Sequence, residues 1–202
     1  ASLMGIGGAP LMSIRMGARR MEEARRIQSN AFLMLCVCGV ILTAVVFPLR
    51  RPMLMAFGAS AVTYPFAEEY FSIYLCGTVF NLLALGLDQF IISQGYSKEG
   101  MKSVMLGAAL NIVLDPVFIF AFDMGVAGAA VATVLSQLAS CVYVLRILLG
   151  RNVPVRIRLG GYRWALMRRI LALGSTPFAI VAIDNVMIIE LNAVLQFYGG
   201  EA

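Results

Sequence analysis

The sequence predicts an all-α polytopic membrane protein, and three observations support this fold class. Hydrophobic residues make up 60% of the chain and charged residues 13%, whereas soluble domains contain roughly 45–50% apolar and about 25% charged residues. Apolar stretches of about twenty residues recur, which is the length of a helix that crosses the hydrocarbon core of a bilayer. The charged residues gather in the gaps between these stretches, as membrane topology requires.

Six apolar segments follow one another along the chain. Residues 1–14 have the composition of the end of a spanning helix, and further spans are expected at residues 28–49, 70–93, 102–122, 126–149 and 170–197. The second span should end near Pro48 and Pro52, because proline lacks a backbone donor and disrupts a helix interior. Residues 53–69 then predict an interfacial or short helical connection, and residues 94–98 (Gln-Gly-Tyr-Ser-Lys) predict a turn.

The charges of the connections predict how the helices are oriented. In chain order the five connections carry net charges of +3, 0, +1, −1 and +7, counted over residues 15–26, 50–69, 98–102, 123 and 146–169. Since cytoplasmic loops carry an excess of Lys and Arg, the first, third and fifth connections should be cytoplasmic. The chain begins with Ala inside one apolar segment and ends just after another, so we expect it to be a piece of a longer protein.

Composition and motifs argue against other classes of protein. The formal net charge of +5 would suit nucleic acid, but a basic binding face needs a soluble domain to carry it. The chain has no His, and its four cysteines lie in apolar runs without zinc-like pairing, which favours a packing role. Nucleophile-elbow and zinc-protease motifs are missing from the sequence, so an enzyme is not expected.

Residues 107–137 hold the most informative polar side chains. Asp115 lies within an apolar run, one helical turn after Asn111 and directly before Pro116. Ionisable residues inside membrane segments are costly and are candidates for a functional site, and Pro116 leaves the carbonyl of Ile112 without its helical donor. This oxygen-rich group suits a Na⁺ ion or a titrating proton relay, as at the broken helices of transporters. The alternative is a neutral carboxyl group that only bonds across the bundle.

Other polar residues in the spans extend this candidate site. Thr133 and Gln137 share a stripe of the following helix, where hydrogen-bonded packing is the alternative role. Asp88 lies shortly before the third connection, and a solvated interfacial position is equally open. Asp184, followed by Asn185, lies centrally in the last span, where a functional role is favoured.

Small residues predict close helix packing in the fifth span. A stripe of them recurs every four residues: Gly128, Ala132, Ser136 and Ser140. Residues at this spacing share one face of a helix, and small side chains let membrane helices approach closely.

Four stretches resemble the multidrug and toxic compound extrusion (MATE) transporters. They are residues 5–24 (GIGGAPLMSIRMGARRMEEA), 87–101 (LDQFIISQGYSKEGM), 107–137 (GAALNIVLDPVFIFAFDMGVAGAAVATVLSQ) and 171–180 (LALGSTPFAI). The resemblance implies a MATE-like two-lobe bundle of twelve helices, of which this chain supplies helices two to seven. It further implies an N-terminal lobe at residues 1–145, a basic cytoplasmic lobe linker at 146–169, and the first helix of the C-terminal lobe at 170–202.

The resemblance also implies a role for the polar residues. The family's proton- or Na⁺-responsive site uses an Asp, an Asn and a Thr of the next helix, which match Asp115, Asn111 and Thr133. A tyrosine that opens the fourth helix of the family matches Tyr70. Related sequences commonly have Asn where this chain has Asp88, so this position adds an acid near the site.

The implied activity is cation-coupled antiport that exports drugs or toxic, often cationic, organic compounds by alternating access. H⁺ or Na⁺ would be the coupling ion, with no other cofactor and no nucleic acid partner. Asp184 matches an acid implicated in coupling or in binding cationic substrate, and we group Asn185 and Gln137 with it. The expected location is a cell membrane, most simply a bacterial inner membrane.

Two alternatives come from other classes of protein. One is a flippase for lipid-linked oligosaccharides on a related fold, whose cavity would need several Lys or Arg to bind pyrophosphate. The other is a membrane assembly partner without transport, which would leave the intramembrane polar residues unexplained.

Overall fold

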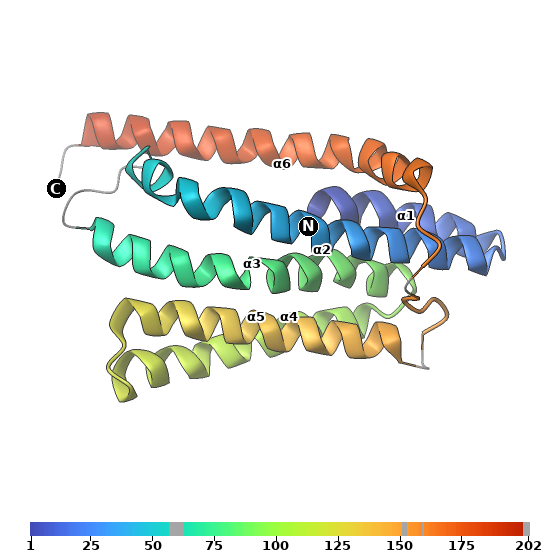
Figure 1. Ribbon diagram of the computed structural model, residues 1–202, viewed down its shortest axis with the longest axis horizontal. Helices are drawn as coiled ribbons and strands as arrows, with labels where there is room; N and C mark the ends of the chain where they lie inside the picture. The colour runs from blue at the N-terminus through green and yellow to red at the C-terminus, as the bar shows by residue number, and fades with distance from the viewer. Residues whose placement is uncertain (57–62, 151–152, 159, 200–202) are drawn as a thin grey trace.

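The computed structural model describes residues 1–56, 63–150, 153–158 and 160–199, most of them helical (Figure 1). The helices are α1 (Ser2–Gly17), α2 (Met21–Ala56), α3 (Tyr64–Ser93), α4 (Ser97–Pro116), the π-helical turn η1 (Val117–Ala121), α5 (Gly125–Leu149) and α6 (Trp164–Gly199). Five are long and apolar enough to cross a membrane: α2, α3, α4 with η1, α5, and α6. The predicted fold class is confirmed.

The helices run side by side, with α3 at the centre of the bundle. It packs against α1 and α2 on one side and against α4 and α5 on the other, while α6 packs on α1 and α2. The α1–α2, α3–α4 and α5–α6 connections lie at one end of the bundle, and the α4–α5 connection lies at the opposite end (Figure 1). The three basic connections therefore share one end, which is the alternation that their charges predicted.

The helix α2 passes through both prolines at which we expected it to end. Pro48 and Pro52 lie inside the helix, so the predicted boundary was wrong. Each proline removes one backbone donor, and membrane helices tolerate this loss when neighbouring groups re-satisfy the backbone. Between them, Arg50 Nε donates to Glu68 Oε1 of α3 at 3.0 Å, and its guanidinium lies 4.5 Å from the ring centre of Phe47. These contacts fix the end of α2 against the first turns of α3.

Within the stretch 53–69, all described residues except Thr63 belong to the two long helices α2 and α3. Residues 53–56 complete α2, and α3 begins at Tyr64 with Pro65 in its first turn. Proline is favoured there because the first helical N–H groups have no partner in the helix. The part of the prediction that concerns residues 57–62 lies outside the described residues.

The helix α4 widens after Pro116 instead of breaking there. In η1 the helical repeat lengthens, and Phe122 N donates to the carbonyl of Val117, five residues earlier, at 3.1 Å. The chain then turns at Asp123, which adopts a left-handed φ of 53°. Turns of π-helix occur frequently at functional sites, and this one directly follows the stretch that carries Asp115.

The small residues of α5 pack closely, as predicted. All four members of the stripe are buried: Gly128, Ala132, Ser136 and Ser140. A Cβ atom on Gly128 would lie 2.7 Å from the carbonyl oxygen of Phe118 in η1. The stripe therefore lets α5 approach the backbone of η1 as well as the neighbouring helices.

The helices α1 and α6 cross with almost no side chains between their backbones. A Cβ atom on Gly174 of α6 would overlap the carbonyl oxygen of Leu3, and one on Gly7 of α1 would lie 2.7 Å from the backbone nitrogen of Gly174. Glycine permits this approach because it has no Cβ. The glycine-rich start of the chain is thus the surface on which α6 packs.

The connection between α5 and α6 is docked on the bundle. Val153, Val155 and Ile157 are buried, whereas the residues between them are exposed. Val155 N donates to Gln94 Oε1 at 2.9 Å, and Ile157 N donates to the carbonyl of Leu148 at 3.1 Å. The alternation of apolar and basic residues thus holds this segment against the ends of the helices.

Two side chains of α2 bind the second half of the same connection. Ser29 Oγ accepts a hydrogen bond from Arg158 N at 3.3 Å, and Asn30 Oδ1 accepts one from Arg163 N at 3.0 Å. The basic stretch predicted at residues 146–169 is only partly a loop, because α5 extends to Leu149 and α6 begins at Trp164.

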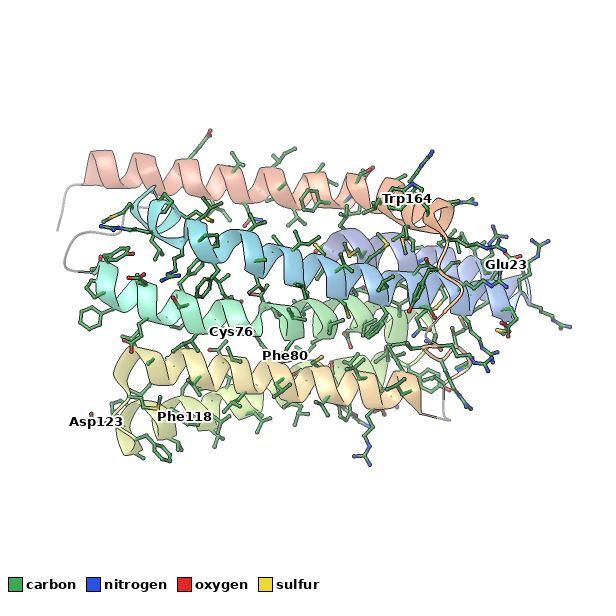
Figure 2. The ribbon with its side chains drawn as sticks, viewed as in Figure 1. Glu23, Cys76, Phe80, Phe118, Asp123 and Trp164 are labelled. Atoms are coloured by element: carbon green, nitrogen blue, oxygen red, sulfur yellow. The ribbon has the colours of Figure 1, made fainter. Side chains whose placement is uncertain are left out.

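The outer faces of the bundle are apolar along its length. Ile112 is 72% exposed, Phe120 79% and Ile183 67%, and Figure 2 shows most nitrogen-bearing side chains near the end with the α1–α2 connection. Exposed apolar faces of this extent are stable in contact with lipid but not with water. The chain is a multi-pass membrane protein.

Candidate functional site

Three side chains from α4 and α5 meet as the sequence predicted. Asn111 Nδ2 donates to Asp115 Oδ1 at 3.0 Å, within one turn of α4, and lies 3.5 Å from Thr133 Oγ1 of α5. The Thr133 hydroxyl donates to the carbonyl of Ala129 at 2.9 Å, so its lone pairs face the amide of Asn111. We call Asn111, Asp115 and Thr133 the outer cluster.

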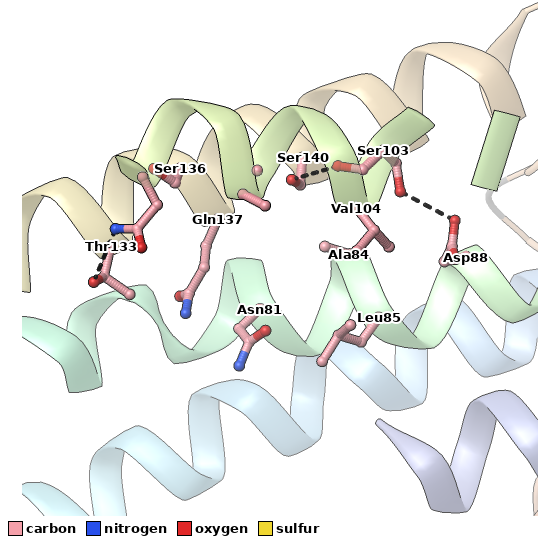
Figure 3. Close-up of a pocket in the computed structure, with 13 residues that line it drawn as sticks. Asn81, Ala84, Leu85, Asp88, Ser103, Val104, Thr133, Ser136, Gln137 and Ser140 are labelled. Atoms are coloured by element: carbon pink, nitrogen blue, oxygen red, sulfur yellow. Dashed lines mark hydrogen bonds between the residues drawn. The ribbon is translucent and has the colours of Figure 1, made fainter. Parts of the chain in front are cut away.

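A cavity of about 240 Å³ extends from the outer cluster between α3, α4 and α5 (Figure 3). Its polar lining includes Asn81 and Asp88 of α3, Ser103 and Asn111 of α4, and Thr133 and Gln137 of α5. Asp115 lies one turn beyond Asn111. The cavity therefore connects the outer cluster with a second acid.

Asp88 closes the opposite end of the cavity and is only 6% exposed. Ser103 Oγ donates to Asp88 Oδ1 at 3.1 Å, and Ser140 Oγ of α5 donates to the carbonyl of Ser103 at 2.9 Å (Figure 3). A Cβ atom on Gly100 would lie 3.0 Å and 3.3 Å from the two carboxyl oxygens. The absence of a side chain at Gly100 thus makes room for the carboxyl group, and the solvated interfacial position that the sequence left open is wrong.

The middle of the cavity presents amide groups. Asn81 Nδ2 lies 3.5 Å from the hydroxyl of Tyr74, whose ring stacks on that of Tyr70 with centroids 6.0 Å apart. Gln137 Oε1 is buried and has no hydrogen-bond partner within the described part of the chain. Figure 3 shows the Gln137 amide pointing from α5 toward Asn81. Buried polar atoms normally have partners, so this oxygen is free to bind water or a cation.

The structure separates the other predicted residues from the outer cluster. Tyr70 does not line the cavity; its ring stacks on that of Tyr74, which contacts Asn81. Asp184 and Asn185 lie on α6, which packs on α1 and α2; Asp184 is exposed, and Asn185 Nδ2 donates to the carbonyl of Val181 at 2.7 Å. Asp184 and Asn185 therefore lie apart from the outer cluster, whereas Gln137, which we grouped with them, lines the cavity beside Asn111 and Thr133.

The sequence analysis missed Asn81 and Ser103, which line the cavity, and Gly100, which lies beside the Asp88 carboxyl group. Asn81 lies seven residues before Asp88, which places both on one face of α3, so the spacing could have revealed it. Ser103 and Gly100 carry no local signal, because their importance comes from their contact with a different helix.

The donor set suits a monovalent cation or a proton better than a transition metal. The cavity offers carboxyl, amide and hydroxyl oxygens, which hard cations prefer. Within the described residues, the structure contains no group of three or more His, Cys, Asp or Glu side chains that could hold a metal ion.

Fold and site together define the class of the protein: a polytopic α-helical membrane protein with a cavity, lined in part by polar side chains, between three of its spanning helices. The sequence model of the MatE family matches residues 1–117. The chain belongs to the MatE family.

The similarity to known proteins covers 86% to 100% of this chain in the three matches below. The multidrug export protein MepA of Staphylococcus aureus (strain NCTC 8325 / PS 47) is 26% identical over 203 residues, which are 100% of this chain and 45% of that protein. The inward-facing conformation of a multidrug resistance MATE family transporter of the MOP superfamily is 28% identical, with a TM-score of 0.81, over 86% of this chain and 40% of that chain. The outward-facing conformation of such a transporter is 27% identical, with a TM-score of 0.80, over 86% and 39%. The chain spans less than half the length of these relatives.

Proposed function

We propose that this chain is part of a cation-coupled antiporter, driven by H⁺ or Na⁺, that exports drugs or toxic, often cationic, organic compounds from a cell. Two kinds of similarity support this function. A related curated protein is a multidrug export protein, and related structures are multidrug resistance transporters in inward- and outward-facing conformations. Alternating access between two such conformations, in a bacterial inner membrane, is the mechanism and location that we propose.

The outer cluster is the observation that carries the coupling part of the proposal. It brings a carboxyl, an amide and a hydroxyl group together inside the spanning helices, where a carboxyl group is expensive without a function. A bound cation can drive transport only if it binds the two conformations unequally. The π-helical turn η1 beside the cluster offers a place where α4 can bend as the cation binds or leaves.

The cavity lining favours export of cations over the alternative of a lipid-linked oligosaccharide flippase. Asp88 is the one ionisable side chain among its lining residues, and no Lys or Arg lines it. A pyrophosphate group would meet no positive charge there. A carboxyl group instead attracts a cationic ligand or the coupling ion.

Asp88, at the end of the cavity opposite the outer cluster, would be a second carboxyl group on the path of the coupling cation. In this proposal a cation that enters at Asp115 reaches Asp88 through the space lined by Asn81 and Gln137. Asp184, Asn185 and Tyr70 would act outside this path, and contact with substrate between two lobes is the role we propose for Asp184. The lobe boundaries are those of the resemblance: residues 1–145, the linker at 146–169, and residues 170–202.

The test is substitution of the acid in the outer cluster. Full-length protein in liposomes should lose substrate efflux driven by a pH or Na⁺ gradient when it carries Asp115→Asn, while its insertion and folding stay normal. Asp123→Asn is the matched control, because Asp123 is an exposed acid at the end of the same helix and Asn tolerates its left-handed φ. Applying the two gradients separately identifies the coupling ion. Undiminished gradient-driven efflux in Asp115→Asn would refute the proposal.

A further inference from the structure

A second polar site lies at the end of the bundle that carries the basic connections. A groove of about 270 Å³ is formed where α1, α2 and the start of α6 meet. Four arginines from four segments line it: Arg15, Arg26, Arg163 and Arg169. We call it the arginine groove. Its remaining lining is apolar apart from Glu23, with Leu11, Ile27 and Leu166.

The positive charge of the groove is only partly neutralised by the protein. Glu23 pairs with Arg15 at 3.2 Å and with Arg20 at 3.5 Å. Among the described residues, Arg26, Arg163 and Arg169 have no carboxylate within ion-pair distance. Three guanidinium groups that converge without acidic partners create a site for an anion, and guanidinium binds phosphate oxygens in a bidentate manner.

The surroundings of the groove place it at a membrane surface. Trp164 directly follows the groove residue Arg163, opens α6 and is 70% exposed (Figure 2). Ile14 of α1, which directly precedes the groove residue Arg15, is 66% exposed. Tryptophan is enriched at the headgroup level of membranes, and exposed aliphatic side chains face the hydrocarbon. The groove thus combines an apolar floor with a cationic rim at the level of lipid headgroups.

We propose that the arginine groove binds the phosphate of an anionic phospholipid. Basic pockets between membrane helices on the cytoplasmic side bind anionic headgroups, and the exposed apolar outer faces of the helices, which include Ile14, accommodate the acyl chains of such a lipid. A free phosphate would gain nothing from these apolar faces. Because α1, α2 and the start of α6 all line the groove, a bound lipid adds a contact between α6 and the two helices on which it packs. The proposal is independent of the coupling ion.

The experiment measures how close anionic lipids come to Trp164, the only tryptophan in this chain. Full-length protein is placed in phosphatidylcholine bilayers that contain brominated phosphatidylglycerol or, at the same mole fraction, brominated phosphatidylcholine. Subtracting the signal of Trp164→Phe isolates the quenching of this residue. We expect stronger quenching by phosphatidylglycerol, and equal quenching by both lipids once Arg163→Gln and Arg169→Gln are combined.

The control removes the same charge elsewhere on the same end of the bundle. Lys98→Gln with Arg146→Gln, two exposed residues outside the groove, should keep the preference for phosphatidylglycerol. Arg163→Gln alone should lose part of the preference for phosphatidylglycerol. This single variant should fold normally, because the Arg163 side chain is exposed and the hydrogen bond from its backbone N to Asn30 remains.

Three results would overturn the proposal. Equal quenching by the two lipids in the unchanged protein would mean that another part of the protein fills the groove. An equal loss of preference in the control would mean that net charge alone attracts the lipid. Displacement of phosphatidylglycerol by inorganic phosphate at constant ionic strength would mean that the groove binds a free anion.

Discussion

The two sides of α3 use buried polar groups for different purposes. On the side of α4 and α5, Asp88, Asn111 and Gln137 line open space. Asp88 bonds to Ser103 and Asn111 to Asp115, and Gln137 Oε1 has no partner among the described residues. On the side of α1, α2 and α6, Gln94 and Asn30 bind backbone N–H groups of the connection before α6, and the helices themselves meet through glycine. In the first region the polar groups line a cavity and remain available to a ligand, whereas in the second Gln94 Oε1 and Asn30 Oδ1 are engaged in holding the connection before α6. This difference distinguishes a binding site from an assembly contact, although both consist of buried polar residues.

The largest effect is expected where α1 and α6 approach each other at Gly7 and Gly174. Gly174→Ala should destabilise the folded protein by about 3 kcal/mol or more, because the new Cβ would overlap the Leu3 carbonyl and backbone cannot move aside as a side chain can. The measurement is the yield and thermal stability of solubilised protein. Gly17→Ala is the control, since a Cβ there meets nothing within 4 Å. A normally stable Gly174→Ala protein would show that α1 and α6 do not cross this closely.

The second largest effect on stability should come from the hydrogen bond between Gln94 and Val155, which holds the connection before α6 on the bundle. Gln94→Leu removes the acceptor of Val155 N, and an unsatisfied buried donor costs about 1–3 kcal/mol. Because 1.4 kcal/mol corresponds to about tenfold in an equilibrium, proteolysis at Arg156 and Arg158 should accelerate by about tenfold while transport changes little. Ser93→Ala, which loses only a bond within α3, should leave proteolysis unchanged. A large loss of transport without faster proteolysis would contradict this division of roles.

A smaller effect, on rate and not on stability, is expected at the inner end of the cavity. Asp88→Asn keeps an acceptor for Ser103 Oγ but removes the titratable group, so gradient-driven efflux should fall by about tenfold if Asp88 relays the coupling proton. Thermal stability should change by less than about 1 kcal/mol. Comparing the pH dependence of efflux in the two proteins checks the role. An unchanged pH dependence of efflux would mean that Asp88 has a structural role, like Gln94 and Asn30 on the other side of α3.

The smallest effect should come from the hydroxyl of the outer cluster. Thr133→Val removes a contact that is 3.5 Å long, at the outer limit of a hydrogen bond. Hydrogen bonds between membrane helices average about 0.6 kcal/mol, so the apparent affinity for the coupling ion should weaken by about threefold. Thr133→Ser retains the hydroxyl and should restore it. Loss of all coupling in Thr133→Val would mean that the hydroxyl binds the ion directly.

Helical spacing predicted that Asn111 and Asp115 share a face, because they are one turn apart. Thr133 lies on the next helix, and its place in the outer cluster was implied by the resemblance to the MATE family. The same reasoning misjudged Pro48 and Pro52, since helix continuation there depends on partners such as Glu68 that lie on another element. It also could not place Asp184, because nothing local to α6 shows which neighbours the helix meets.

The sequence by itself determined that the chain is a helical membrane protein, which connections are basic, and which acid lies directly before a proline inside a span. These properties follow from composition, apolar length and helical periodicity, and each acts within a few turns of one segment. Only the tertiary structure decided that Asp88 shares a cavity with Asn111, that Gly7 and Gly174 meet, and that four distant arginines converge. Such contacts depend on the rotation and crossing of helices far apart in the chain, and packing sets both of these.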